Sequence, residues 1–210
     1  MLFKWLITKG VSMYGQFVLD EFVLDEVRSG NGWWGNKNAY QLGVKWIDVL
    51  GINNLDLQLE ANAARPYTYS HGSAYGSYSN YHQSLAHPAG ANFKEYISIV
   101  RYQPIPRLNL SFKTFLIKTG RDGNNQNWGS DILKKNTTRQ MNYDNQTGQG
   151  NATNIFFADF TASYMFWHNF YVDFKQVIRK SDSALPAYNY NTTLSSLALR
   201  INIAQRTYEF

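Results

Sequence analysis

The sequence predicts an all-β protein, an antiparallel transmembrane β-barrel of the outer-membrane type with about eight strands in this chain. Residue type alternates between apolar and polar within most strand-like runs, as expected for strands with one lipid face and one lumen face. The connections also alternate between short turns and long polar loops, as on the two sides of such barrels. Short turns are expected at Leu50–Asn53, Pro104–Arg107 and Trp167–Asn169, and long loops at Val23–Asn36, Thr68–Asn92, Gly120–Asn154 and Ser181–Asn191.

The composition agrees with this class. The 210 residues are 16% aromatic and 17% charged, contain no cysteine and have a mean hydropathy of −0.42. No run approaches the ~18–20 consecutive apolar residues of a membrane-spanning helix, and in a barrel only every second residue meets lipid. The absence of cysteine excludes a disulfide scaffold and a thiolate metal site. The net charge of +5 is not gathered into a basic run, so no nucleic-acid partner is expected.

The first strand-like segments alternate in the expected way. Phe3–Ile7 has the character of the tail of a strand, which turns through Thr8-Lys9-Gly10 into a first complete strand near Val11. That strand and Tyr40–Trp46 place apolar and polar side chains at alternate positions. The apolar set is Val11, Met13, Phe17, Leu19, Tyr40, Leu42, Val44 and Trp46, and the polar set is Ser12, Tyr14, Gln16, Asp20, Gln41, Gly43 and Lys45.

The run Asn54–Ala64 has the strictest alternation. A helix would scatter its leucines around the circumference, so the run is predicted as a strand. One face carries Leu55, Leu57, Leu59, Ala61 and Ala63, and the other carries Asp56, Gln58, Glu60 and Asn62. The next run, Phe93–Tyr102, is less regular, and the sequence leaves open which of its faces meets lipid.

Four further strands complete the expected eight. They are predicted at Leu108–Leu116, Phe156–Phe166, Phe170–Lys175 and Leu197–Ile203. The alternation slips between Ile203 and Phe210, which predicts a bulge or a short extension there. The last three residues, Tyr208-Glu209-Phe210, resemble the terminal aromatic signal read by the barrel-assembly machinery, which is therefore an expected partner.

Charged residues follow the polar faces of these strands. A charge on the lipid face at mid-membrane costs roughly 2–4 kcal/mol, whereas an inward charge hydrates or pairs across strands. The sequence leaves open whether these charges merely fill a lumen or line a transport pathway. They are Asp20, Asp56, Glu60, Asp159, Asp173, Lys45, Lys113, Lys175, Arg179 and Arg200.

The start of the chain leads to an expectation about its parent. Met1–Gly10 has neither the apolar length nor the small-residue cleavage site of a secretion signal. Together with the partial first strand, this predicts that residues 1–210 form a single barrel segment of a larger barrel whose N-terminal part is missing here.

The long loops are the expected place of function because a rigid barrel carries its binding residues there. Tyrosine rings stack on the C–H faces of sugars, amides and hydroxyls meet glycan hydroxyls, and a guanidinium suits an acidic polysaccharide. The candidate polysaccharide-binding residues are Trp33, Trp34, Arg65, Tyr67, Tyr69, His71 and His87.

The same loop residues allow alternatives to glycan binding. The tyrosines would equally form an aromatic girdle that holds the loop down. His71, His82 and His87 invite a metal site, but their spacing matches no compact metal motif. A serine hydrolase would need a nucleophile elbow or triad signature that the sequence does not display. The prediction is therefore a non-catalytic protein without a metal or cofactor.

Six segments carry a resemblance to a known family: Tyr14–Phe22, Gly32–Lys37, Asn54–Glu60, Arg65–His71, Leu85–Pro88 and Gly90–Glu95. They resemble the Wzi-type capsule-assembly family, in particular the Bacteroidetes branch often labelled as gliding-motility RemB-like proteins. The resemblance implies an outer-membrane protein of more than eight strands that binds and organises surface polysaccharide without an enzymatic step. A diffusion pore and a structural component of a gliding or secretion apparatus are the alternatives.

Overall fold

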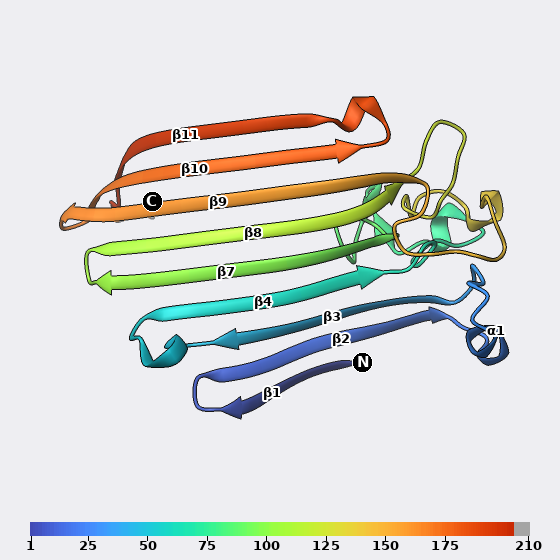
Figure 1. Cartoon of the computed structure of the whole chain (residues 1–210), viewed down its shortest axis with the longest axis horizontal. Coiled ribbons are helices and arrows are strands. Elements are labelled where there is room, and N and C mark those ends of the chain that lie inside the picture. Colours follow the sequence, from blue (N-terminus) through green and yellow to red (C-terminus); the bar gives the residue numbers. More distant parts are fainter. Residues whose placement is uncertain (204–210) are drawn as a thin grey trace, which may run out of the picture.

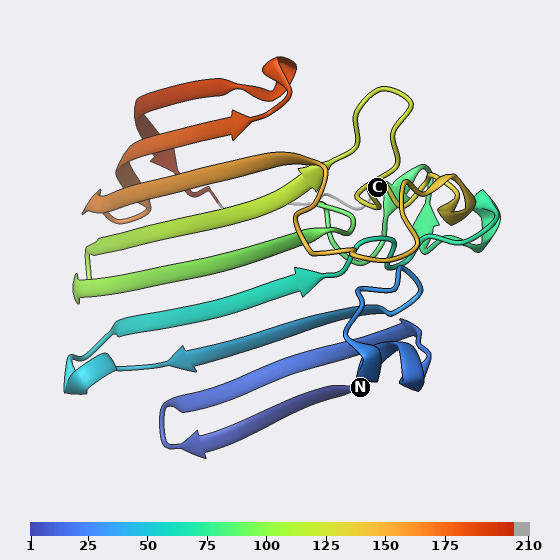
Figure 2. The same ribbon diagram turned by 45° about the vertical axis from the view of Figure 1, so that its right-hand side comes forward.

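The computed structural model describes residues 1–203 and shows an all-β protein built on one open, nine-stranded antiparallel sheet (Figure 1). The sheet is twisted and curved (Figure 2). Its strands are β1 Leu2–Thr8, β2 Val11–Glu21, β3 Lys37–Trp46, β4 Leu55–Ala64, β7 Phe93–Ile105, β8 Leu108–Arg121, β9 Asn151–Trp167, β10 Phe170–Ser183 and β11 Tyr190–Ile201. The connections hold helix α1 Leu24–Ser29, the short hairpin β5 Ser79–Asn80 and β6 Gln83–Ser84, and 3₁₀ turns at Val49–Gly51, Ala74–Gly76, Asn136–Thr138 and Pro186–Tyr188.

The order of strands in the sheet is their order along the chain, so every neighbouring pair is joined by a direct connection. All eight expected complete strands are present, and the expected partial strand is β1, which pairs along β2. The sheet is not closed into a barrel: β1 and β11 are its two edges. Because nine strands alternate in direction, β1 and β11 run the same way. Closing them directly would create a parallel pair in an otherwise antiparallel sheet.

Short and long connections lie at opposite ends of the sheet, as the sequence predicts (Figure 1). Some boundaries differ from the prediction. The turn expected at Leu50–Asn53 is a longer connection, residues 47–54, which includes a 3₁₀ turn. The long loop expected at Ser181–Asn191 is shorter, residues 184–189, because the β10–β11 ladder continues to the pairs Lys180–Asn191 and Ser181–Tyr190. We refer to the two ends as the turn end and the loop end.

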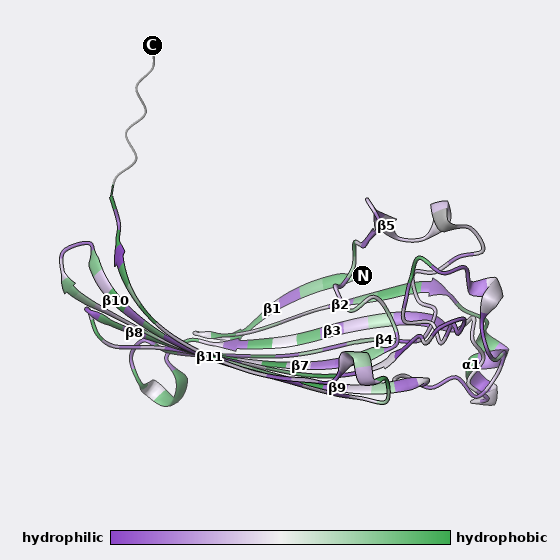
Figure 3. Ribbon diagram, turned by 90° about the horizontal axis from the view of Figure 1, so that it is seen from above, coloured by the Kyte–Doolittle hydropathy of each residue, from purple (hydrophilic) through white to green (hydrophobic). Residues whose placement is uncertain are grey.

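The two faces of the sheet differ in chemistry, and hydropathy alternates along the strands (Figure 3). Cross-strand partners lie on the same side of a sheet, so the register assigns each residue to a face. The polar face includes Tyr14, Gln41, Glu60, Glu95, Asp159 and Asp173, and the apolar face includes Leu42, Leu59, Val100, Phe112, Phe160 and Leu199.

The register also settles the face of the irregular strand β7. Ile97 lies opposite Glu60 and therefore belongs to the polar face, whereas Ser98 lies opposite Leu59 on the apolar face. Hydropathy alone would place Ile97 on the other side. The predicted cross-strand charge pairs form on the polar face, where Lys175 lies 3.1 Å from Asp159 and Arg200 lies 2.7 Å from Asp173.

The buried hydrophobic residues are concentrated at the loop end. There, two long connections fold back onto the polar face. The cluster consists of Ala39, Ala64, Tyr69, Ala91, Phe93 and Ile132. Within the described chain, no helix is long and apolar enough to cross a membrane. The predicted bulge before Phe210 and the terminal aromatic signal lie outside the described residues.

Candidate functional site

Three long connections form a hydrogen-bonded layer at the loop end of the sheet. This loop layer consists of residues 22–36, 65–92 and 122–150. The Tyr67 N–H donates to the Gly129 carbonyl at 3.0 Å, and the Trp34 N–H donates to the Asn142 carbonyl at 2.9 Å. Segments far apart in the sequence are thereby joined into one ordered unit.

Asn92 connects this layer to the sheet. Its side chain is fully buried, and its amide nitrogen donates to the carbonyls of Gly120 at 2.8 Å, Gln149 at 3.0 Å and Trp128 at 3.3 Å. Its amide oxygen accepts the Gly148 N–H at 2.7 Å. Asn92 adopts a φ of 57°, a left-handed conformation that asparagine tolerates better than most residues. Asparagine is therefore suited to this position both by its side chain and by its backbone.

Trp34, one of the predicted sugar-binding residues, is part of a stack within the loop layer. The Arg139 guanidinium lies 4.2 Å from its ring centroid, and the Lys37 ammonium lies 5.2 Å from it. Lys37 is itself fully buried, where it pairs with Glu21 at 2.8 Å and donates to the Ser70 carbonyl at 2.7 Å. Trp33 packs beside Trp34 with ring centroids 5.7 Å apart. The pair thus holds the layer together.

Tyr67 and Arg65 also contribute to packing. Tyr67 is 0% exposed, its hydroxyl donates to the Asn127 carbonyl at 2.9 Å, and burial raises its pKa to about 12. Burial likewise lowers the pKa of the Arg65 guanidinium, whose Nη2 donates to the Asn145 carbonyl at 3.4 Å. The arrangement of Tyr67 matches the alternative in which loop tyrosines hold the loop down.

The remaining candidates, Tyr69, His71 and His87, line one cleft of about 630 Å³ between the loop layer and the polar face of β2, β3 and β4. Tyr69 is only 8% exposed, but Tyr78 packs on it with ring centroids 6.0 Å apart and is itself 55% exposed. The polar groups of the cleft come from the sheet floor and the covering loop. They include Gln16, Gln41, Asn62, His71 and His87.

Each histidine of the cleft contacts a carboxylate of the sheet. His71 Nε2 lies 3.3 Å from Asp20 Oδ1, and the other oxygen of Asp20 accepts the Tyr69 N–H at 3.0 Å. His87 Nε2 lies 3.0 Å from Glu95 Oε2, while its Nδ1 accepts the Ala89 N–H at 3.1 Å. Since Nδ1 is an acceptor, Nε2 carries the proton and donates to Glu95. These contacts fix the loop over the polar face.

The floor of the cleft is a continuous polar network. Glu60 accepts hydrogen bonds from Tyr14, from Gln41 at 2.8 Å and from Asn62 at 2.9 Å. Asn62 also donates to Glu95 at 2.8 Å, which links Glu60 to the His87 contact. Buried polar groups that are fully paired hold their side chains in one arrangement, so the floor is preorganised.

A second cavity of about 470 Å³ adjoins the cleft and shares Gln41, Asn62 and His87 with it. Its other wall is apolar. Ile97, Phe115, Ile117 and Ile155 form this wall on the polar face of β7, β8 and β9. The two hollows together present hydrogen-bonding groups next to an apolar surface.

Two arrangements that catalytic sites commonly use are not present in the described residues. Within residues 1–203, no cluster of three or more His, Asp or Glu residues is placed to hold a metal ion. In the same part of the chain, neither His71 nor His87 has its ring hydrogen-bonded to a serine hydroxyl, the pairing that a serine nucleophile needs. Ring nitrogens and carboxylates are instead paired with one another.

The candidates predicted from the sequence include His71 and His87 but not Gln41, Asn62 or Tyr78, which line the same cleft. Gln41 and Asn62 occupy ordinary polar positions of alternating strands, so only the register reveals that they face the cleft. No family model matches the sequence, and comparison with curated proteins and with solved structures likewise finds no match. The resemblance to capsule-assembly proteins therefore stays a prediction.

Proposed function

We propose that this chain is a segment of an outer-membrane β-barrel that binds and organises surface polysaccharide without catalysing a reaction. The membrane part of the proposal is supported by the apolar face. Side chains such as Leu42, Leu59, Phe112 and Leu199 are extensively exposed there. Contiguous exposed apolar surface of this kind fits contact with lipid.

Aromatic residues border this apolar face toward both ends. Trp5, Trp46 and Tyr164 lie toward the turn end, and Tyr40 and Tyr96 lie toward the loop end. Aromatic side chains prefer the two membrane interfaces because one part of the ring is apolar and another polar. Because outer-membrane barrels have their long loops outside and their short turns in the periplasm, the proposed orientation has the loop end facing the cell exterior.

A larger barrel fits the topology. An odd number of additional strands between β11 and β1 would close an entirely antiparallel barrel, because the two edges run in the same direction. This matches the even strand numbers of bacterial outer-membrane barrels. The barrel-assembly machinery and outer-membrane lipid are the partners that such a protein requires.

The 630 Å³ cleft is the single observation that carries the binding proposal. It combines a phenol ring at Tyr78, two imidazoles and the amides of Gln41 and Asn62 over a preorganised floor. Small-molecule sites have this volume and this mixture of ring surface and few oriented polar groups. Saccharides present C–H faces for rings and hydroxyls for amides, so a few sugar units of a glycan chain match the cleft.

A diffusion pore is less consistent with this arrangement. Residues 65–92 lie over the loop end of the polar face, fixed by the contacts from His71 to Asp20 and from His87 to Glu95. A solute that diffused along the polar face would be obstructed by residues 65–92. We therefore favour binding over conduction.

The test is binding of the purified full-length protein to the surface polysaccharide of its own cells, measured by calorimetry. The site variant is Tyr78→Ala with Gln41→Ala, because both residues line the cleft and neither is fully buried. The control is Tyr81→Ala, a tyrosine of the same loop that is 90% exposed and lies outside the cleft.

We expect at least a tenfold weaker affinity for the site variant, since each lost contact contributes about 1 kcal/mol. The control should bind like the unchanged protein. Equal binding by both variants would move the site elsewhere, and failure of the unchanged protein to bind would refute the polysaccharide proposal.

A further inference from the structure

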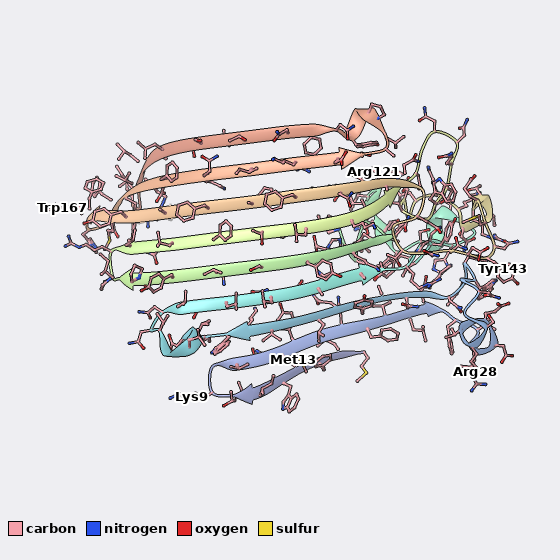
Figure 4. The ribbon with its side chains drawn as sticks, viewed as in Figure 1. Lys9, Met13, Arg28, Arg121, Tyr143 and Trp167 are labelled. Carbon is pink, nitrogen blue, oxygen red and sulfur yellow. The ribbon has the colours of Figure 1, made fainter. Side chains whose placement is uncertain are left out.

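The apolar face carries very few charges, and those it carries are gathered at one end. On the described strands they are Lys94, Lys118, Lys180 and Asp182. All four lie near the loop end. Arg28, Arg121 and Tyr143 mark that end in Figure 4, and Lys9 and Trp167 mark the opposite one.

Each lysine lies immediately beyond the apolar band of its strand. Two residues nearer the turn end on each strand, the apolar face carries Tyr96 on β7, Leu116 on β8 and Ile178 on β10. On each of these three strands, the lysine is therefore the first charged residue of the apolar face on the loop-end side of the hydrophobic residues. All three side chains are exposed.

The three lysines differ from the paired cations of the polar face. Lys94 and Lys118 are direct cross-strand neighbours, an arrangement of like charges that is unfavourable without a counterion. Within residues 1–203, none of the three lysines forms an ion pair, whereas Lys175 and Arg200 on the polar face do. Asp182 pairs in register with Asn154 and lies on the same face as the lysines. Glu26 and Asp144 line a hollow beside Lys94 together with Arg65.

We infer that Lys94, Lys118 and Lys180 form a binding site for the phosphorylated headgroup of an outer-leaflet lipid. This inference rests on the proposed membrane-spanning function. A lysine ammonium is a compact donor suited to phosphate. Its position just above an apolar band places the ammonium at headgroup depth while acyl chains cover the residues below. Charge complementarity and depth together favour a lipid over a soluble anion.

The test compares the full-length protein with the variant Lys94→Gln, Lys118→Gln, Lys180→Gln. The control variant Lys9→Gln, Arg107→Gln, Lys113→Gln removes the same number of charges from the turn end and the polar face. Bound lipid is counted by native mass spectrometry after exposure to bisphosphorylated lipid A, to the same lipid without phosphates, or to bisphosphorylated lipid with excess inorganic phosphate. Carbonate extraction of membranes is measured in parallel for all three proteins.

We expect the site variant to lose about a hundredfold of its affinity for the bisphosphorylated lipid, since each of the three lysines near an anionic surface contributes roughly fivefold. The control and the unchanged protein should retain the lipid and prefer it over the phosphate-free form. Equal retention by the site variant and the control would overturn the inference. So would displacement of the lipid by inorganic phosphate, because the site would then recognise a free anion.

Carbonate extraction separates this inference from the function on which it rests. If all three proteins resist extraction but the site variant binds lipid as well as the control does, only the lipid site is refuted. If the unchanged protein is released by carbonate, the membrane-spanning proposal itself fails.

Discussion

The loop end and the half of the sheet nearer the turn end, which we call the turn half, are held together in different ways. At the loop end, side chains such as Tyr67, Asn92 and Lys37 are completely buried and hydrogen-bonded within the protein. In the turn half, Leu199 is 77% exposed, and the strands are held mainly by their backbone ladders. The loop end resembles the interior of a water-soluble protein, whereas the turn half exposes the apolar surface that folding in water would bury.

For a membrane-spanning protein of the kind proposed, this difference would mean that the two regions obtain their stability from different surroundings. The loop layer excludes water from its own polar groups by pairing them. In the proposed outer-membrane setting, lipid in place of water around the exposed apolar face would stabilise that face. Substitutions in the two regions should therefore respond differently to the surrounding medium.

The largest effect is expected from a charge on the apolar face. Leu197→Arg, at a central position of the apolar face of β11, should reduce the free energy of unfolding in lipid vesicles by about 2–4 kcal/mol, because the guanidinium would enter hydrocarbon. Its neighbour Ala198 lies on the polar face opposite Asp173, so Ala198→Arg is the matched control with a small expected effect. Urea titration monitored by tryptophan fluorescence measures both. Equal losses would contradict the assignment of the two faces.

A somewhat smaller effect should follow from removing the Asn92 side chain. Asn92→Ala leaves four buried hydrogen-bonding groups without their partner and should destabilise the loop layer by about 2–3 kcal/mol. Hydrogen exchange should rise in residues 65–92 and 122–150 while the ladders of β8–β11 stay protected. Asn124→Ala, at an exposed position of the same layer, is the control. Uniform loss of protection across the sheet would show that the two regions unfold together.

Removal of a cation from the Trp34 stack should be milder. Arg139→Gln eliminates a guanidinium 4.2 Å from the ring centroid and should cost about 1 kcal/mol. The melting temperature of the loop layer, followed by near-ultraviolet circular dichroism, should fall by a few degrees. Lys135→Gln, at a neighbouring position outside the stack, should leave it unchanged. A stack that tolerates Arg139→Gln without change would mean that Lys37 alone supports Trp34.

The smallest effect is expected on the polar face. Lys175→Gln removes an ion pair of 3.1 Å to Asp159, and because Lys175 is largely exposed the cost should be about 0.5 kcal/mol. High salt should reduce the difference between the variant and the unchanged protein. If the free energy of unfolding instead fell by several kcal/mol and the loss did not change with salt, the ion pair would be shielded from water and the prediction would be wrong.

The candidate site could be predicted only in part. His71 and His87 stand out because they are imidazoles in a long polar loop, and both line the cleft. Trp34, Arg65 and Tyr67 stand out on similar grounds but lie in the packing of the loop layer. A loop sequence contains no periodicity that separates an inward side from an outward side, so chemistry alone cannot sort binding residues from packing residues.

The sequence by itself determined the strands, their antiparallel succession and the separation of turns from loops. These features depend on neighbouring residues, since alternation has a period of two and direct connections join consecutive strands. Tertiary structure alone decided the face of Ile97, the burial of Tyr67, the cleft under residues 65–92 and the position of Lys94, Lys118 and Lys180 on one face near the loop end. Each of these depends on contacts between residues far apart in the chain, which become neighbours only when register and loop packing bring them together.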